Sequence, residues 1–114
     1  MSMVTLEEAR GYLRVGETVD DGRIASLLNS AEKITADVAQ MNAAEWNAVC
    51  DEATESMTIR GKEILVAEIL QLRSLLRTAV LYAIGYLYGH WEESNHRALV
   101  VMLRRLLRPS AQNK

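Results

Sequence analysis

The chain is organised around one apolar stretch, SLLRTAVLYAIGYLYGHW, which runs from Ser74 to Trp91 and carries no formal charge between Arg77 and Glu92. As a helix, this run spans only about two-thirds of the hydrocarbon core of a bilayer, so it predicts a buried helix rather than a membrane span. Its apolar residues fall on more than one face, which requires neighbours on most sides, and another subunit is a candidate for some of them. The stripe expected in the core consists of Leu76, Val80, Ala83 and Leu87, and the second stripe consists of Leu81, Ile84 and Tyr88.

The length and composition bound the fold class. A chain of 114 residues is long enough for one domain with a modest core. One proline, no phenylalanine and an apolar fraction of 49% fit an ordered helical protein better than a sheet protein or a disordered tail. We therefore expect one all-α bundle over residues 1–114. The single cysteine, Cys50, has no partner for an internal disulfide, and the first six residues lack a signal-peptide pattern, which indicates a cytoplasmic origin.

Capping signals and apolar spacing divide the chain into five expected helices. Thr5 and Glu8 form a capping-box pattern that starts the first helix, and residues 42–45 repeat the pattern at a bend. Residues 54–62 give the weakest pattern, and a loop or one short strand fits them equally well. Pro109 is expected to stop the last helix two residues earlier. The expected helices span residues 5–14, 21–41, 43–53, 63–90 and 95–107.

The charge is distributed unevenly along the chain. Residues 1–57 hold four basic and eleven acidic side chains, a net charge of −7, whereas the remainder holds nine and four, a net charge of +5. Beyond Glu93 every charged side chain is basic. An acidic head and a basic tail suit subunits that pack head against tail, or a basic end that docks on an acidic partner. For any single charge, a solvated helix face is the simpler explanation.

The sequence offers no constellation of catalytic or metal-binding residues. His90 and His96 are six residues apart, on different helix faces, and no further ligand stands at a metal-binding spacing. Cys50 follows the apolar spacing of a short helix and is interpreted as a structural thiol. Paired carboxylates fall at expected helix ends, where capping and the helix dipole explain them. We therefore expect no enzyme activity, no metal and no cofactor.

The last expected helix is basic and amphipathic, with Arg97, Arg104 and Arg108 on one face. DNA binding is the minority interpretation, because the pI is near 5.7 and no helix-turn-helix signature is present. The arginines either complement the negative end of their own helix or dock on an acidic protein surface. The residues assigned to docking are Arg97, Arg104, Arg105 and Arg108.

Two glycines, Gly85 and Gly89, lie four residues apart in the apolar helix, with Tyr82 one turn before them. Glycine costs a helix about 1 kcal/mol relative to alanine, so two glycines on one side indicate the close approach of another backbone. That backbone belongs either to the same chain or to a neighbour. The residues assigned to a subunit contact are Tyr82, Gly85, Gly89 and Trp91.

Three segments of the chain, taken in their order and spacing, carry a resemblance to a known protein family. They are VTLEEARGYLRVGETVDDGRIASLLNSAEKITADV, LRTAVLYAIGYLYGHWEE and NHRALVVMLRRLLRP. Together they resemble the head-tail connector, or adaptor, proteins of long-tailed phages and prophages, over residues 3–38 and 75–108, with a looser match over 42–73. Where relatives tend to have glutamate and arginine, this chain has Gly89 and Trp91, so an apolar contact through Trp91 would replace an ion pair between subunits.

The resemblance implies a structural protein of the virion neck, made in the cytoplasm of a bacterial host. It implies a homo-oligomeric, twelvefold ring that sits beneath the portal protein after DNA packaging and carries the stopper or tail-completion protein. DNA would pass through the lumen without sequence-specific binding, and no membrane is involved. In this interpretation acidic residues of the first half flank the channel, and the basic last helix docks on the portal.

The alternative is a small helical interaction or regulatory protein that works as a dimer. The same apolar helix would then form the dimer seam. A DNA-binding regulator is less favoured, since it requires salt-dependent binding to duplex DNA by an acidic protein.

Overall fold

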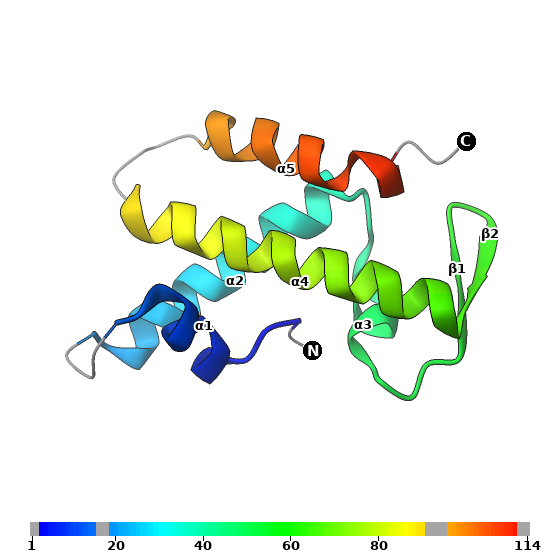
Figure 1. Cartoon of the computed structure of the whole chain (residues 1–114), viewed down its shortest axis with the longest axis horizontal. Helices are drawn as coiled ribbons and strands as arrows, with labels where there is room; N and C mark the ends of the chain where they lie inside the picture. The colour runs from blue at the N-terminus through cyan, green and yellow to red at the C-terminus, as the bar shows by residue number, and fades with distance from the viewer. Residues whose placement is uncertain (1–2, 16–18, 91–95, 112–114) are drawn as a thin grey trace.

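Five helices and one small β-hairpin make up the part of the chain that the computed structural model describes, namely residues 3–15, 19–90 and 96–111, with side chains up to Leu107 (Figure 1). In chain order the elements are α1 (Leu6–Leu13), α2 (Asp21–Val38), α3 (Ala43–Cys50), β1 (Ser56–Ile59), β2 (Lys62–Leu65), α4 (Val66–Gly89) and α5 (Arg97–Ala111).

Helix α4 is the centre of the fold, because each of the other four helices packs against it. In Figure 1, α2 passes behind α4, α5 runs alongside it in the opposite direction, and the hairpin adjoins its first turn. The predicted core stripe is confirmed, since none of its four residues is more than 3% exposed. Ile84 of the second stripe is also fully buried. Most apolar side chains of α4 are therefore buried against other elements of the same chain.

The predicted capping boxes form at α1 and α3. The Thr5 hydroxyl accepts a hydrogen bond from the Glu8 amide at 3.0 Å, and the Glu8 carboxylate accepts one from the Thr5 amide at 3.0 Å. Asn42 and Glu45 make the same reciprocal pair at 2.8 and 2.9 Å. These pairs satisfy amides that have no partner within the helix.

Helices α2 and α3 end three residues earlier than expected, at Val38 and Cys50. Gln40 adopts a left-handed conformation with φ of 60°, and the Met41 amide donates to the Ala36 carbonyl at 3.0 Å. This pattern of bonds closes the C-terminus of α2 and turns the chain towards α3.

The all-α expectation is wrong between residues 54 and 65. Instead of a loop or a single strand, β1 and β2 form an antiparallel pair in which Met57 opposes Ile64. Arg60 and Gly61 both have positive φ, 53° and 79°, as a two-residue hairpin turn of type I′ requires. Helix α4 consequently begins at Val66 and not near residue 63. The domain is mainly helical with a small two-stranded sheet.

Helix α5 extends to Ala111, past the proline that was expected to stop it. Pro109 removes only one backbone donor, the one that would bond the Arg105 carbonyl, so the helix loses a single bond near its end and continues for two more residues. The buried side of α5 consists of Leu99, Leu103 and Leu107, each fully buried.

Candidate interaction surfaces

Along α4 a stripe of uncharged residues faces solvent, bordered by Arg77 and interrupted at Gly85 by Tyr12 of α1. In Figure 1, α4 lies in front of α2, with α5 on one side of it and α1 on the other. Leu70 is 53% exposed and Tyr82 is 37% exposed, although both are large and apolar or aromatic. We call this surface the α4 outer face, and its exposed residues are Leu70, Ser74, Thr78, Tyr82 and Gly89.

The α4 outer face begins at an apolar patch with an acidic rim. Alternation along β2 buries Ile64 and leaves Glu63 and Leu65 exposed on the outward side of the hairpin. Leu65 is 58% exposed and is followed by Val66, which is 45% exposed. The carboxylate of Glu68 accepts from the Leu65 amide at 3.5 Å and so lies beside the patch. We call this group, Glu63, Leu65, Val66 and Glu68, the acidic end of α4.

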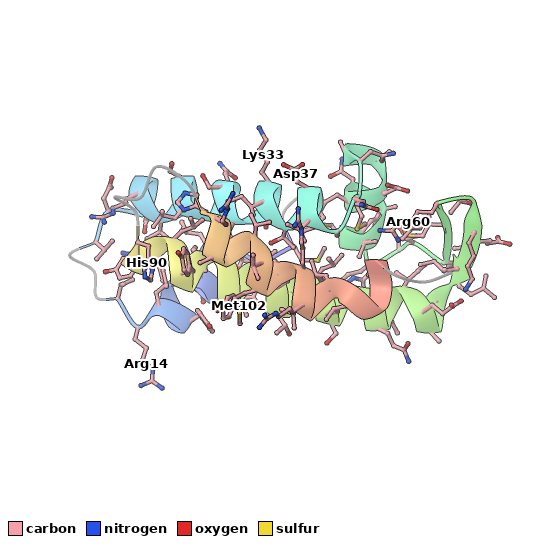
Figure 2. The ribbon with its side chains drawn as sticks, turned by 90° about the horizontal axis from the view of Figure 1, so that it is seen from above. Arg14, Lys33, Asp37, Arg60, His90 and Met102 are labelled. Atoms are coloured by element: carbon pink, nitrogen blue, oxygen red, sulfur yellow. The ribbon has the colours of Figure 1, made fainter. Side chains whose placement is uncertain are left out.

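The outer face of α5 combines apolar and basic side chains. Val101 and Met102 are each 40% exposed, and Arg104 and Arg105 are exposed beside them. Figure 2 shows Met102 on the side of α5 that is turned away from α2. No acidic residue occurs in Arg97–Ala111.

The helix dipole accounts for Arg108 in the last turn of α5 but not for Arg97 or Arg104. Arg97 is the first residue of α5, at the positive end of the dipole, and Arg104 lies near the middle of the helix. Arg97, Arg104 and Arg105 are exposed, as a docking surface requires, whereas the side chain of Arg108 lies outside the described part of the chain.

The four residues predicted to meet a neighbouring subunit divide into three groups. Tyr82 and Gly89 are exposed on the α4 outer face. Gly85 has a partner within the chain, because a Cβ atom added there would lie 3.1 Å from Cε2 of Tyr12 in α1. Its small size therefore admits the Tyr12 ring, and no neighbour is needed to explain it. Trp91 lies outside the described residues.

An ion pair joins α1 to α4 beside these surfaces. The Arg77 guanidinium donates to both carboxylate oxygens of Glu8, at 3.1 Å from Nη1 to Oε1, and to the Met3 carbonyl. The hydrogen bonds from Arg77 lower the pKa of Glu8 to about 2. The folded-state pKa is depressed, so the contribution of this pair to stability is present above the ordinary carboxyl range and is lost as the pH falls towards 2. The pair is half exposed, which keeps that contribution small.

The acidic first half also contains a half-buried carboxylate, Glu32. It accepts hydrogen bonds from the amides of Met3 and Val4, at 2.8 and 3.3 Å, and one from the Trp46 side chain. Burial nevertheless raises the pKa of Glu32 above its ordinary value. Glu32 and Trp46 border a shallow groove of about 300 Å³ between α2 and α3. Figure 2 shows Lys33 and Asp37, from the rim of this groove, pointing away from the body of the domain.

Because its folded-state pKa is raised, Glu32 weakens the fold as the pH rises through the interval between its ordinary and its raised pKa. We expect Glu32→Gln to gain stability relative to the wild type across that interval, since the amide stays neutral. Urea unfolding at a series of pH values measures the difference. Glu7→Gln, at an exposed carboxylate of α1, is the matched control. If the difference in free energy of unfolding between Glu32→Gln and the wild type does not change with pH, the pKa of Glu32 is not raised in the folded state.

The remaining reactive side chains do not assemble into a catalytic centre in the described part of the chain. Burial raises the pKa of the Cys50 thiol to about 11, so the thiol is protonated at neutral pH and is a poor nucleophile. His90 stacks on Tyr86 with ring centroids 4.1 Å apart, and His96 meets the same ring edge-on. No group of three or more possible metal ligands lies together among the described residues.

The described helices include none that is long and apolar enough to cross a membrane. Comparison with known proteins finds no matching family model, curated protein or solved structure.

Proposed function

We propose that the chain is a head-tail connector of a long-tailed phage or prophage. In this role it forms a twelvefold ring beneath the portal and joins the DNA-filled capsid to the stopper or tail. The observation that carries the proposal is the presence of two exposed apolar surfaces on one small domain, one with an acidic rim on α4 and one with a basic rim on α5. A subunit that only assembles with other proteins requires such surfaces and no catalytic pocket.

Within this function, the line of arginines on α5 is proposed to dock on the portal. Arg97 and Arg104 lie seven residues apart on one side of α5, and Arg108 continues the line in the sequence. A surface that lacks carboxylates over a whole helix steers and orients an acidic partner. Arg104, which is exposed near the middle of α5, is not positioned to complement the helix dipole and is available to an acidic portal surface.

A binding experiment with the portal protein encoded in the same genome tests this function. Arg104→Glu is expected to reduce portal binding at least tenfold in biolayer interferometry, since it places a carboxylate in the centre of the basic line. Lys33→Glu is the matched control, because Lys33 points outward from α2 on another side of the domain (Figure 2). Unchanged portal binding by Arg104→Glu, or no binding by the wild type, would count against the proposal.

The dimeric interaction protein remains a second candidate because the α4 outer face is uncharged and partly apolar. Two copies packed through this face would bury Leu70 and Tyr82, which are the large exposed side chains of the face. The oligomeric state distinguishes this candidate from a ring.

A further inference from the structure

The acidic end of α4 and the outer face of α5 are alike in their apolar centres and opposite in the charge of their rims. Each has two adjacent apolar side chains at its centre, Leu65 and Val66 on one surface and Val101 and Met102 on the other, all at least 40% exposed. Carboxylates border the first pair and guanidinium groups border the second. Apolar centres with charged rims of opposite sign are typical of two surfaces that bind each other.

The two carboxylates stand on either side of the apolar pair. Glu63 shares the outward side of β2 with Leu65, two residues away, and Glu68 reaches back to the Leu65 amide from the first turn of α4. An apolar partner without cations would leave these carboxylates to be desolvated without compensation. The partner that fits is therefore apolar and basic together.

On α5, Arg105 is the arginine placed to meet those carboxylates. It follows Val101 by four residues and Met102 by three, so the three side chains share one side of the helix. Arg97 and Arg104, seven residues apart, lie along the opposite edge of the same face, beyond Val101. Figure 2 shows that the Met102 side of α5 is the side turned away from α2.

We propose that α5 of a second copy of the chain docks on the acidic end of α4 and extends along the α4 outer face. Val101 and Met102 of one copy pack against Leu65, Val66 and Leu70 of the next, and Arg105 pairs with Glu63 and Glu68. The lengths agree, since α5 runs about 15 Å from Val101 to Ala111 and the α4 outer face runs about 18 Å from Leu70 to Tyr82, before Tyr12 meets Gly85, at 1.5 Å per residue.

The arrangement proposed is head-to-tail, since two different surfaces on different elements allow each copy to bind two neighbours. Every copy offers its α5 to one neighbour and receives α5 from another, and such contacts close into a ring or continue as a chain. The inference deepens the proposed function by naming the contact between subunits, and it rests on that function only for the closure of the ring. Arg105, which the sequence assigns to portal docking, is reassigned here to the contact between subunits, and Arg97 and Arg104 are left to the portal.

A charge-swap experiment on the isolated full chain tests the contact. Sedimentation velocity over a concentration series is expected to show self-association of the wild type. Glu63→Arg and Arg105→Glu should each weaken it at least tenfold. The double variant, and an equimolar mixture of the two single variants, should regain it, because each then restores opposite charges across the contact. Lys33→Glu, at an exposed cation of α2 outside both surfaces, is the matched control and should associate like the wild type.

A second measurement guards against a variant that folds poorly. In a Cys50→Ser background, Val66→Cys and Met102→Cys chains of different mass are mixed and oxidised mildly. The heterodimer is expected to exceed both homodimers several-fold. A monomeric wild type at all concentrations, no recovery in the double variant, or a statistical mixture of disulfide dimers would overturn the inference. If self-association follows the prediction and Arg104→Glu still binds the portal like the wild type, the contact stands and the proposed function fails.

Discussion

Leu76→Ala is expected to lower the free energy of unfolding by about 3 to 4 kcal/mol, because the leucine is fully buried in the middle of α4. All the other helices pack on α4, so a cavity at this position is enclosed by several elements that cannot all move in to fill it. Urea denaturation followed by circular dichroism gives the change directly.

Leu70→Ala is the matched control, with the same residue type on the same helix six positions earlier. Leu70 is 53% exposed in one copy, so at concentrations at which the chain is monomeric its truncation should change the free energy of unfolding by less than about 0.5 kcal/mol. Similar losses for the two variants would show that α4 is enclosed differently from the arrangement described.

The second large effect is expected at Arg73, which ties α4 to the end of α3. Its Nε atom donates to the Val49 carbonyl at 2.7 Å, and its Nη2 atom donates to the Asp51 carbonyl at 3.1 Å. Arg73→Ala removes both charge-assisted bonds and leaves carbonyls at the negative end of α3 without these donors. We expect a loss of about 2 kcal/mol in the free energy of unfolding.

Arg73→Lys separates charge from geometry at this position. An ammonium group keeps the charge but does not reproduce the two directed donors of the planar guanidinium, so we expect it to recover only part of the loss. In thermal and urea unfolding we expect the wild type to be the most stable, Arg73→Lys to be intermediate and Arg73→Ala to be the least stable. Equal stability of the alanine variant and the wild type would show that these bonds contribute nothing.

The helices were predictable because their signals are local and repeated. The α4 core stripe follows from four apolar residues at helical spacing, and the starts of α1 and α3 follow from reciprocal capping pairs that need no tertiary contact. The hairpin was missed because each strand has only four residues and its turn is Arg60-Gly61, not the commoner Asn-Gly. Met57 and Ile59 do alternate with polar residues, and that alternation is the signal that the sequence offers for the first strand.

The surfaces were harder to predict than the core. The arginines of α5 predict its basic character, but the sequence pattern places residues 63–65 in the helix and so does not predict the acidic end of α4. As part of β2, Leu65 turns outward between Glu63 and Glu68. The partner of Gly85 was equally hidden, since the approach of Tyr12 depends on how α1 lies across α4. Both features depend on tertiary geometry that no spacing rule contains.

Native mass spectrometry of the wild-type chain, alone and mixed with the portal protein of the same genome, tests the central claim most directly. We expect a closed ring of identical subunits, twelvefold and bound to the portal in the mixture. A stable dimer that forms no ring even when the portal is present would contradict the proposed connector and would favour the dimeric interaction protein.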